Sequence, residues 1–249
     1  MKNLVITLSL LSLFLISCTH YYYAPNVQNV PLFTEKNDLR LAGSYGFGVS
    51  ARYLELQSAY SASNHIGVML NFMRASETIF DTYAGKGYYY EGAVGYYKPI
   101  KPDGSFEVYG GFAISDQHHK NGSSGGDEYL TFTKMFIQPS IGSTANGFDI
   151  AFSTRFSRVA FNKIDYTNFT YINSPSALDD LTNNKVSFLL EPALTTRMGW
   201  KNFKIQAQFQ RSINLTNSDL PFELYNINFG IYITIADKYR KPPIKAAGK

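Results

Sequence analysis

Apolar and polar residues alternate along most of the chain, in short segments separated by turn residues, from about Asp38 onward. In residues 203–210 the odd positions are apolar and the even positions are Lys or Gln, and residues 225–236 place Tyr, Ile and Phe at odd positions. Because side chains of a β-strand point alternately to opposite faces, such segments predict strands with one apolar face. The pattern predicts ten strands, over residues 38–47, 51–60, 65–74, 87–98, 105–115, 129–141, 147–157, 185–197, 203–210 and 225–236.

Short and long connections alternate between these predicted strands. The links after the second, fourth, sixth and eighth strands are short turns, whereas those after the third, fifth, seventh and ninth are long and polar. This asymmetry is typical of transmembrane barrels, which have tight periplasmic turns and longer outer loops. An even number of strands puts both ends of the barrel on the short-turn side, so we expect both chain termini to be periplasmic. The short link near Gly46–Ser50 is an exception to the alternation.

The polar faces of the predicted strands are mostly Gly, Ala, Ser, Thr, Asn and Gln. A solvated face would be dense in Lys and Glu, so the pattern favours a single antiparallel up-and-down β-barrel with its apolar face outward. Closing the ring satisfies every strand edge, which lipid requires. The lumen would then hold a few charged residues that pair with one another: Glu55, Glu91, Glu107, Arg155, Glu191 and Arg197.

Two interpretations of these lumenal charges remain open from the sequence. They could line a narrow path for ions or small solutes, or they could fill a salt-bridged interior that only stabilises the barrel. Ten strands leave little free bore once side chains fill it, which favours the second interpretation.

The N-terminus has the features of a secretion signal. Met1-Lys2-Asn3 is a short basic start, and the apolar run Leu4–Ile16 is too short to span a bilayer, so residues 1–17 are predicted to be a signal peptide. The run ends in Leu15-Ile16-Ser17-Cys18, which resembles the lipobox of bacterial lipoproteins. The resemblance implies cleavage before Cys18 by the lipoprotein-processing machinery and acylation of Cys18, with palmitate among the chains. An ordinary secretory signal that contains a cysteine is the alternative.

The remaining segments complete the predicted organisation. Residues 18–37, with two prolines and no periodicity, are predicted to be an extended tether, residues 38–237 the barrel, and residues 238–249 a basic tail. In the last strand, Asn228, Gly230, Ile233 and Ile235 resemble the assembly signal of outer-membrane barrel proteins. That resemblance implies recognition by the outer-membrane assembly machinery, although the family pattern ends the chain with an aromatic residue and this chain continues.

Composition and candidate chemistry change this picture little. Charged residues make up 17% of the chain, against about 25% in globular proteins, and the basic excess lies in the tail, so no nucleic-acid partner is expected. The pair His118-His119 has Asp116, Asp127 and Glu128 nearby in sequence, but a metal site needs three or four convergent ligands. With no nucleophile motif beside these residues, we expect no metal, no cofactor and no enzyme activity.

These features together predict an outer-membrane β-barrel lipoprotein of a Gram-negative bacterium. Its role would be structural or in surface interaction, with long loops facing outward and membrane lipid around the barrel and on Cys18. The alternatives are a narrow pore, or a membrane-tethered, lipocalin-like barrel that binds a ligand. The residues do not identify a ligand, a protein partner or the oligomeric state.

Overall fold

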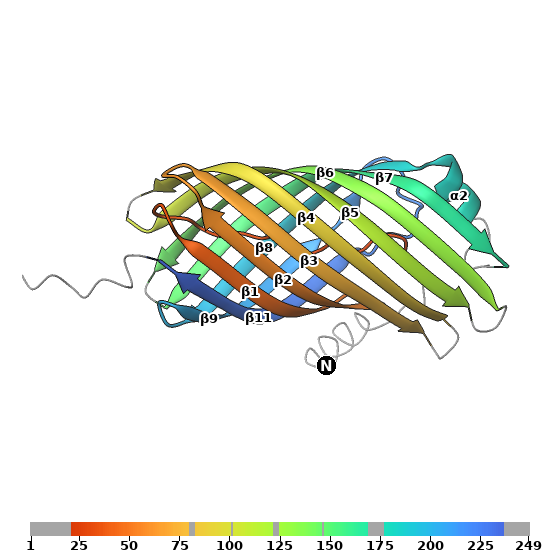
Figure 1. The fold of residues 1–249 in the computed structure, drawn as a ribbon, viewed down its shortest axis with the longest axis horizontal. Helices are drawn as coiled ribbons and strands as arrows, with labels where there is room; N and C mark the ends of the chain where they lie inside the picture. The colour runs from red at the N-terminus through yellow and green to blue at the C-terminus, as the bar shows by residue number, and fades with distance from the viewer. Residues whose placement is uncertain are drawn as a thin grey trace, which may run out of the picture.

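The computed structural model describes residues 21–79, 83–100, 102–121, 125–145, 147–168 and 177–236 of the chain. Their main feature is one closed antiparallel β-barrel (Figure 1). Its ten strands are β1 (Leu39–Phe47), β2 (Ala51–Ser61), β3 (Ile66–Ile79), β4 (Tyr83–Ile100), β5 (Gly104–Asn121), β6 (Gly126–Ala145), β7 (Phe148–Thr167), β8 (Val186–Gly199), β9 (Phe203–Arg211) and β11 (Tyr225–Ile235). A two-residue strand, β10 (Ile213–Asn214), pairs with β8, and a short helix, α2 (Ala177–Asn183), lies between β7 and β8.

The ring closes because each strand pairs with its neighbours in sequence and the first pairs with the last. Residues of β1 lie opposite β11 from Leu39↔Ile235 to Phe47↔Ile227. Each of the ten predicted strands overlaps one barrel strand, so the predicted all-β, ten-stranded up-and-down barrel is confirmed. Among the residues described, no helix is long and apolar enough to cross a membrane.

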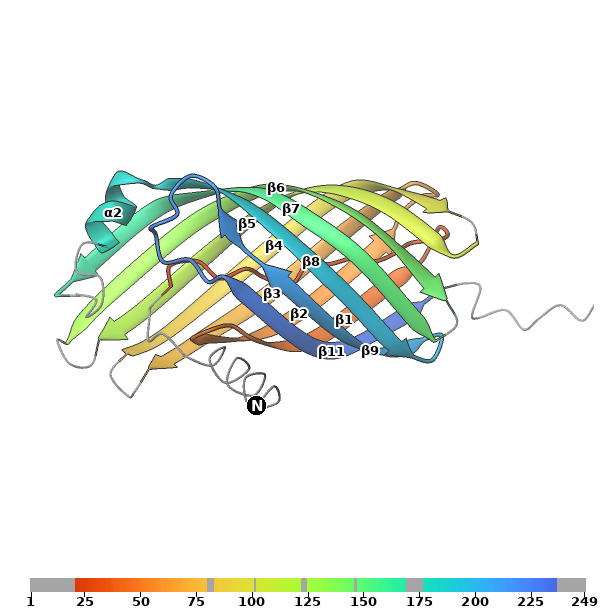
Figure 2. The same cartoon turned by 180° about the vertical axis from the view of Figure 1, so that it is seen from behind.

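The two ends of the barrel differ in their links and in the height of the wall. At one end, called here the short-turn end, tight turns join β2 to β3, β4 to β5, β6 to β7 and β8 to β9, and β1 begins and β11 ends there. The opposite end is called the long-loop end. Strands β6 and β7 have 20 residues each, whereas β1 and β9 have nine, so the wall rises higher at the long-loop end on the β4–β7 side (Figures 1 and 2).

The longer strands replace part of the predicted loops. Strands β3 to β7 extend into the segments 75–86, 116–128 and 158–184 that the sequence analysis assigned to loops, and α2 occupies part of the last one. The reason is visible in the sequence: beyond Asp116 on β5 and Arg158 on β7 the outward positions become polar. The backbone continues to pair there, but the strands no longer carry the apolar alternation by which they were recognised.

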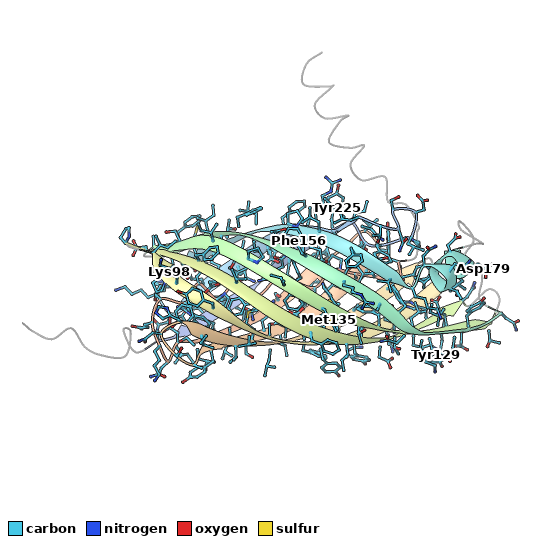
Figure 3. The ribbon with its side chains drawn as sticks, turned by 90° about the horizontal axis from the view of Figure 1, so that it is seen from above. Lys98, Tyr129, Met135, Phe156, Asp179 and Tyr225 are labelled. Carbon is cyan, nitrogen blue, oxygen red and sulfur yellow. The ribbon has the colours of Figure 1, made fainter. Side chains whose placement is uncertain are left out.

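The outer surface of the barrel is a belt of apolar side chains, seen as outward-pointing sticks in Figure 3, where Met135 and Phe156 are labelled. Leu70, Met135, Ile137 and Phe156 are each more than half exposed. The belt ends towards the long-loop end at outward-facing charged residues, namely Arg52, Arg74, Lys86, Asp116, Arg158 and Arg211. An apolar band around a closed ring is the surface that a lipid bilayer requires.

Candidate functional site: the filled lumen

The interior of the barrel is occupied by the chain's own N-terminal segment. Residues 22–33, called here the plug, are buried throughout apart from half-buried Ala24. Tyr22, Val30 and Phe33 are fully buried. This segment falls within the predicted tether of residues 18–37, so over these residues the chain is inside the barrel rather than beside it. Twelve extended residues reach at most about 40 Å, which is enough to cross a bilayer's hydrocarbon core of about 30 Å.

The plug runs from the long-loop end to the short-turn end. Tyr23 forms a parallel bridge with Phe222, in the link between β9 and β11 at the long-loop end. At the other end the hydroxyl of Ser61, the last residue of β2, donates to the carbonyl of Glu35 at 2.8 Å. The first described residue, Tyr21, and the last, Ala236, therefore lie at opposite ends of the barrel. This differs from the prediction that both termini leave on the short-turn side, because the strand count did not include the plug.

Carboxylates and amides of the wall satisfy backbone N–H groups of the plug. The N–H of Val27 donates to both carboxylate oxygens of Glu55, at 3.0 and 2.9 Å, and the N–H of Phe33 donates to Glu107 at 2.8 Å. Backbone groups that are buried without partners cost free energy, and the plug makes no strand ladder of its own. These two acids therefore bind the plug backbone.

Side chains of the wall also donate to plug carbonyls. Gln138 donates to Asn29 at 2.8 Å, Arg197 to Val30 at 2.7 Å, and Tyr232 to Pro31 at 2.8 Å. Because these donors come from β6, β8 and β11, they approach the plug from different sides of the ring.

Arg155 lies at the centre of the lumen and is fully buried. Its guanidinium donates to Asn26 of the plug at 2.8 Å and to Gln138 at 2.8 and 3.1 Å. One of its nitrogens lies 3.2 Å from the carboxylate of Glu91, and the guanidinium carbon is 4.3 Å from the ring centroid of Phe136. A planar fork of five donors suits such a site, because several acceptors can be satisfied at once.

A second buried ion pair lies nearer the long-loop end. The Lys134 ammonium is 2.9 Å from the carboxylate of Glu191 and donates to the hydroxyl of Tyr23 at 2.6 Å. The Tyr23 hydroxyl in turn donates to Glu191 at 2.5 Å, and Ser157 donates to the same acid at 3.0 Å. Lys134 was not among the predicted lumenal residues, because residues 129–141 carry apolar or aromatic residues on both faces.

Arg197 forms the third cationic site of the lumen. Its guanidinium lies 3.8 Å from Asp149, donates to Gln206 at 2.7 Å, and stacks over the Tyr232 ring at 3.7 Å. Lys204 pairs with the same Asp149. The structure thus places all six predicted charged residues in the lumen, but only Glu91 and Arg155 pair with each other; the others use partners from outside the predicted set.

Apolar contacts hold the part of the plug that lies nearer the short-turn end. The ring of Phe33 packs on Tyr97 with centroids 5.3 Å apart. A β-carbon on Gly67 would lie 2.8 Å from the Phe33 ring, and one on Gly142 would lie 2.8 Å from Leu32. These two glycines therefore leave the space that the plug side chains occupy.

At the long-loop end the plug is hydrogen-bonded to Glu223, which lies in the link between β9 and β11. Its N–H donates to the carbonyl of Tyr23 at 2.8 Å, and its carboxylate accepts from the N–H groups of Val49 and Ser50 at 2.7 and 3.5 Å. Burial raises the pKa of Glu223 to about 7, although these backbone donors act in the opposite direction. The residue links the plug, the β9–β11 connection and the β1–β2 link.

The histidines do not assemble a metal centre in the described part of the chain, where no group of three or more His, Cys, Asp or Glu side chains could hold an ion. His118 lies 2.8 Å from Asp127 and stacks on Tyr129 with centroids 4.1 Å apart. The tyrosines of β4 divide between the two faces of the wall: Tyr88, Tyr90 and Tyr96 face outward, whereas Tyr89 and Tyr97 are buried in the lumen. Cys18 lies outside the described residues.

A closed ring, an apolar exterior and a polar, filled interior define the class: a membrane-spanning β-barrel of the outer-membrane type. No family model matches the chain, and no curated protein matches it.

Solved structures that are similar to the barrel include three bacterial proteins. The first is the outer membrane protease OmpT of Escherichia coli, at 8% identity and a TM-score of 0.46, over 82% of this chain and 98% of that one. The second is an outer membrane channel of Pseudomonas putida F1, at 10% identity and 0.41, over 85% and 100%. The third is Ail, the attachment invasion locus protein of Yersinia pestis, at 11% identity and 0.34, over 81% and 100%.

Proposed function

We propose that this chain is an outer-membrane lipoprotein whose sealed barrel presents a surface for interaction at the long-loop end, without catalysis. The observation that carries the proposal is the plug. Residues 22–33 lie in the lumen and hydrogen-bond to its wall, so they occupy space that a solute path or a bound ligand would need. The apolar exterior and the lipobox Leu15-Ile16-Ser17-Cys18 support a lipoprotein in the outer membrane. We expect the short-turn end to face the periplasm.

The tall side of the wall supports a role in surface interaction. Beyond the apolar belt, Lys86, His118, Tyr129 and Asp165 lie opposite one another on β4, β5, β6 and β7. Their outward, mixed-charge face stands on paired strands rather than on loops. A rigid sheet that carries polar and aromatic side chains above the membrane is suited to contact a partner at low entropic cost.

A narrow pore is the second candidate, and one observation favours it. Along β9 and β11, facing the plug, the side-chain amides of Gln210 and Asn228 are buried with no hydrogen-bond partner in the structure, as is the amide nitrogen of Gln206. Buried amides normally have partners, so this side of the lumen is the place where water or a small ion would pass the plug.

Conductance across a planar lipid bilayer distinguishes the two candidates. We expect the intact mature protein to give no current steps, and a variant lacking residues 22–33 to give them. A variant lacking residues 216–219, which lie in the β9–β11 link and bond to β8 rather than to the plug, is the control and should stay closed. If the intact protein conducts like the plug-deleted variant, the sealed barrel is contradicted and the pore takes its place. If the deletion variant fails to fold, the conductance of the intact protein alone still distinguishes the two candidates: current steps favour the pore, and their absence favours the sealed barrel.

A further inference from the structure

The plug begins at the long-loop end of the barrel, level with the link between β1 and β2. Tyr21 and Ala24 line a small cavity together with residues of the β1–β2 link and of β3, β4 and β5, among them Ser50, Glu77 and His119, so the start of the plug lies against this part of the wall, level with the β1–β2 link. That link is the one that the alternation of short and long loops did not predict. With nine residues in β1 against 20 in β7, the wall beside this link is lower than on the β4–β7 side.

The rim beside this link carries exposed apolar side chains next to the charged Arg52. Phe47, the last residue of β1, is 46% exposed, and Leu224, next to Glu223, is 47% exposed. Leu215, in the same link between β9 and β11, is exposed too. Large apolar side chains that face outward at a rim indicate that lipid reaches this level of the barrel.

We propose that the chain is threaded outward through its own barrel, so that the acyl chains on Cys18 enter the membrane leaflet on the long-loop side. The proposal rests on the proposed function for the lipid on Cys18 and for the outward direction of the long loops. Cys18 precedes Tyr21 by three residues, which reach at most about 11 Å. The opposite leaflet lies across about 30 Å of hydrocarbon, so an anchor at Cys18 cannot return to it.

Threading gives the plug a fixed point at each end. Towards the short-turn end it continues into β1 through a turn at Asn37, whose N–H donates to the carbonyl of Ser61 at 2.9 Å. Towards the long-loop end the acyl chains would retain it in the membrane. A plug held on both sides cannot slide out in either direction, which distinguishes it from a loop that folds in and out of a lumen.

The test places one short epitope at three positions of the full-length chain, in three separate versions expressed in a Gram-negative host. The positions are between His20 and Tyr21, after Ser218 in the β9–β11 link, and after Lys201 in a short turn. Antibody labelling is measured on intact cells and again after the outer membrane is permeabilised. A fourth measurement follows incorporation of an alkyne analogue of palmitate into the wild type and into Cys18→Ala.

We expect the N-terminal and Ser218 epitopes to be labelled on intact cells, the Lys201 epitope only after permeabilisation, and palmitate only in the wild type. If the N-terminal epitope needs permeabilisation while the Ser218 epitope does not, the threading is contradicted and the proposed orientation stands. If the Lys201 epitope is labelled on intact cells and the Ser218 epitope is not, the proposed function fails in its orientation. Equal palmitate signals in the wild type and Cys18→Ala would contradict the anchor.

Discussion

At the scale of single residues, three buried cations each connect an acid of the wall to the plug. Lys134 joins Glu191 to Tyr23, Arg155 joins Glu91 to Asn26, and Arg197 joins Asp149 to Val30. Burying a charge is costly unless it is paired and hydrogen-bonded, and the plug adds one further hydrogen bond to each of these cations. The charges therefore stabilise the filled state of the lumen.

Replacement of Arg155 tests this role. Arg155→Met leaves the carboxylate of Glu91 buried without its cation, so we expect unfolding in urea, measured in lipid vesicles, to become easier by about 3–5 kcal/mol. The double variant Arg155→Met/Glu91→Gln should recover part of this loss, since no unpaired charge remains. Lys163→Met is the control, because Lys163 lies on the same strand in an exposed ion pair, and we expect it to cost less than about 1 kcal/mol. A loss no larger for Arg155→Met than for the control would contradict a stabilising network.

Whether a charged residue of the lumen could be predicted from the sequence depended on the residues beside it in its own strand. Arg155 and Glu107 stand on strands with one clearly apolar face, so the opposite face identifies them as lumenal. The strand of Lys134 has apolar or aromatic residues on both faces, so the alternation does not tell whether Lys134 faces the lumen or the lipid. Tyr23 and Asn26 lie in a segment without periodicity, and the partners of their side chains lie up to 168 residues away along the chain.

At the scale of elements, the ten barrel strands followed from local alternation and the plug did not. Pro25 and Pro31 indicate an extended chain, but they do not tell whether it runs in water or inside a barrel. One signal was present: residues 21–34 contain no charged side chain, whereas an exposed linker is usually rich in charged and small polar residues. That signal, with the Asn and Gln residues of the segment, could have indicated a polar but dry environment.

The packing of the Phe33 ring against Gly67 of β3 provides a prediction at this scale. Gly67→Ala puts a methyl group 2.8 Å from the Phe33 ring and 2.6 Å from the Tyr109 hydroxyl, so we expect a loss of about 1–3 kcal/mol in the free energy of unfolding. Gly110→Ala is the matched control on β5, because nothing lies within 4 Å of its β-carbon position. Urea unfolding of both variants measures the difference. Equal stability of the two variants would mean that the Phe33 ring does not pack against Gly67.

At the scale of the whole molecule, the exterior requires a bilayer. Leu70, 67% exposed in the middle of the apolar belt, would tolerate a charge if it faced water. In lipid, we expect Leu70→Arg to destabilise the barrel by about 2–4 kcal/mol, measured by unfolding in lipid vesicles. Asn64→Arg, in the exposed turn between β2 and β3, should change stability by less than about 0.5 kcal/mol. If both variants were equally stable, the belt would not be in contact with lipid.

Residues 22–33 fill the lumen, and backbone hydrogen exchange of the plug tests this filling without any substitution. The protein is reconstituted in lipid vesicles, placed in deuterated buffer, and digested for mass spectrometry. We predict that peptides covering the plug exchange as slowly as those of β6 and β7, because the N–H groups of Val27, Gln28 and Phe33 are buried and bonded to the wall. Exchange of the plug within seconds, while the strands stay protected, would contradict the filled lumen and return the segment to a tether outside the barrel.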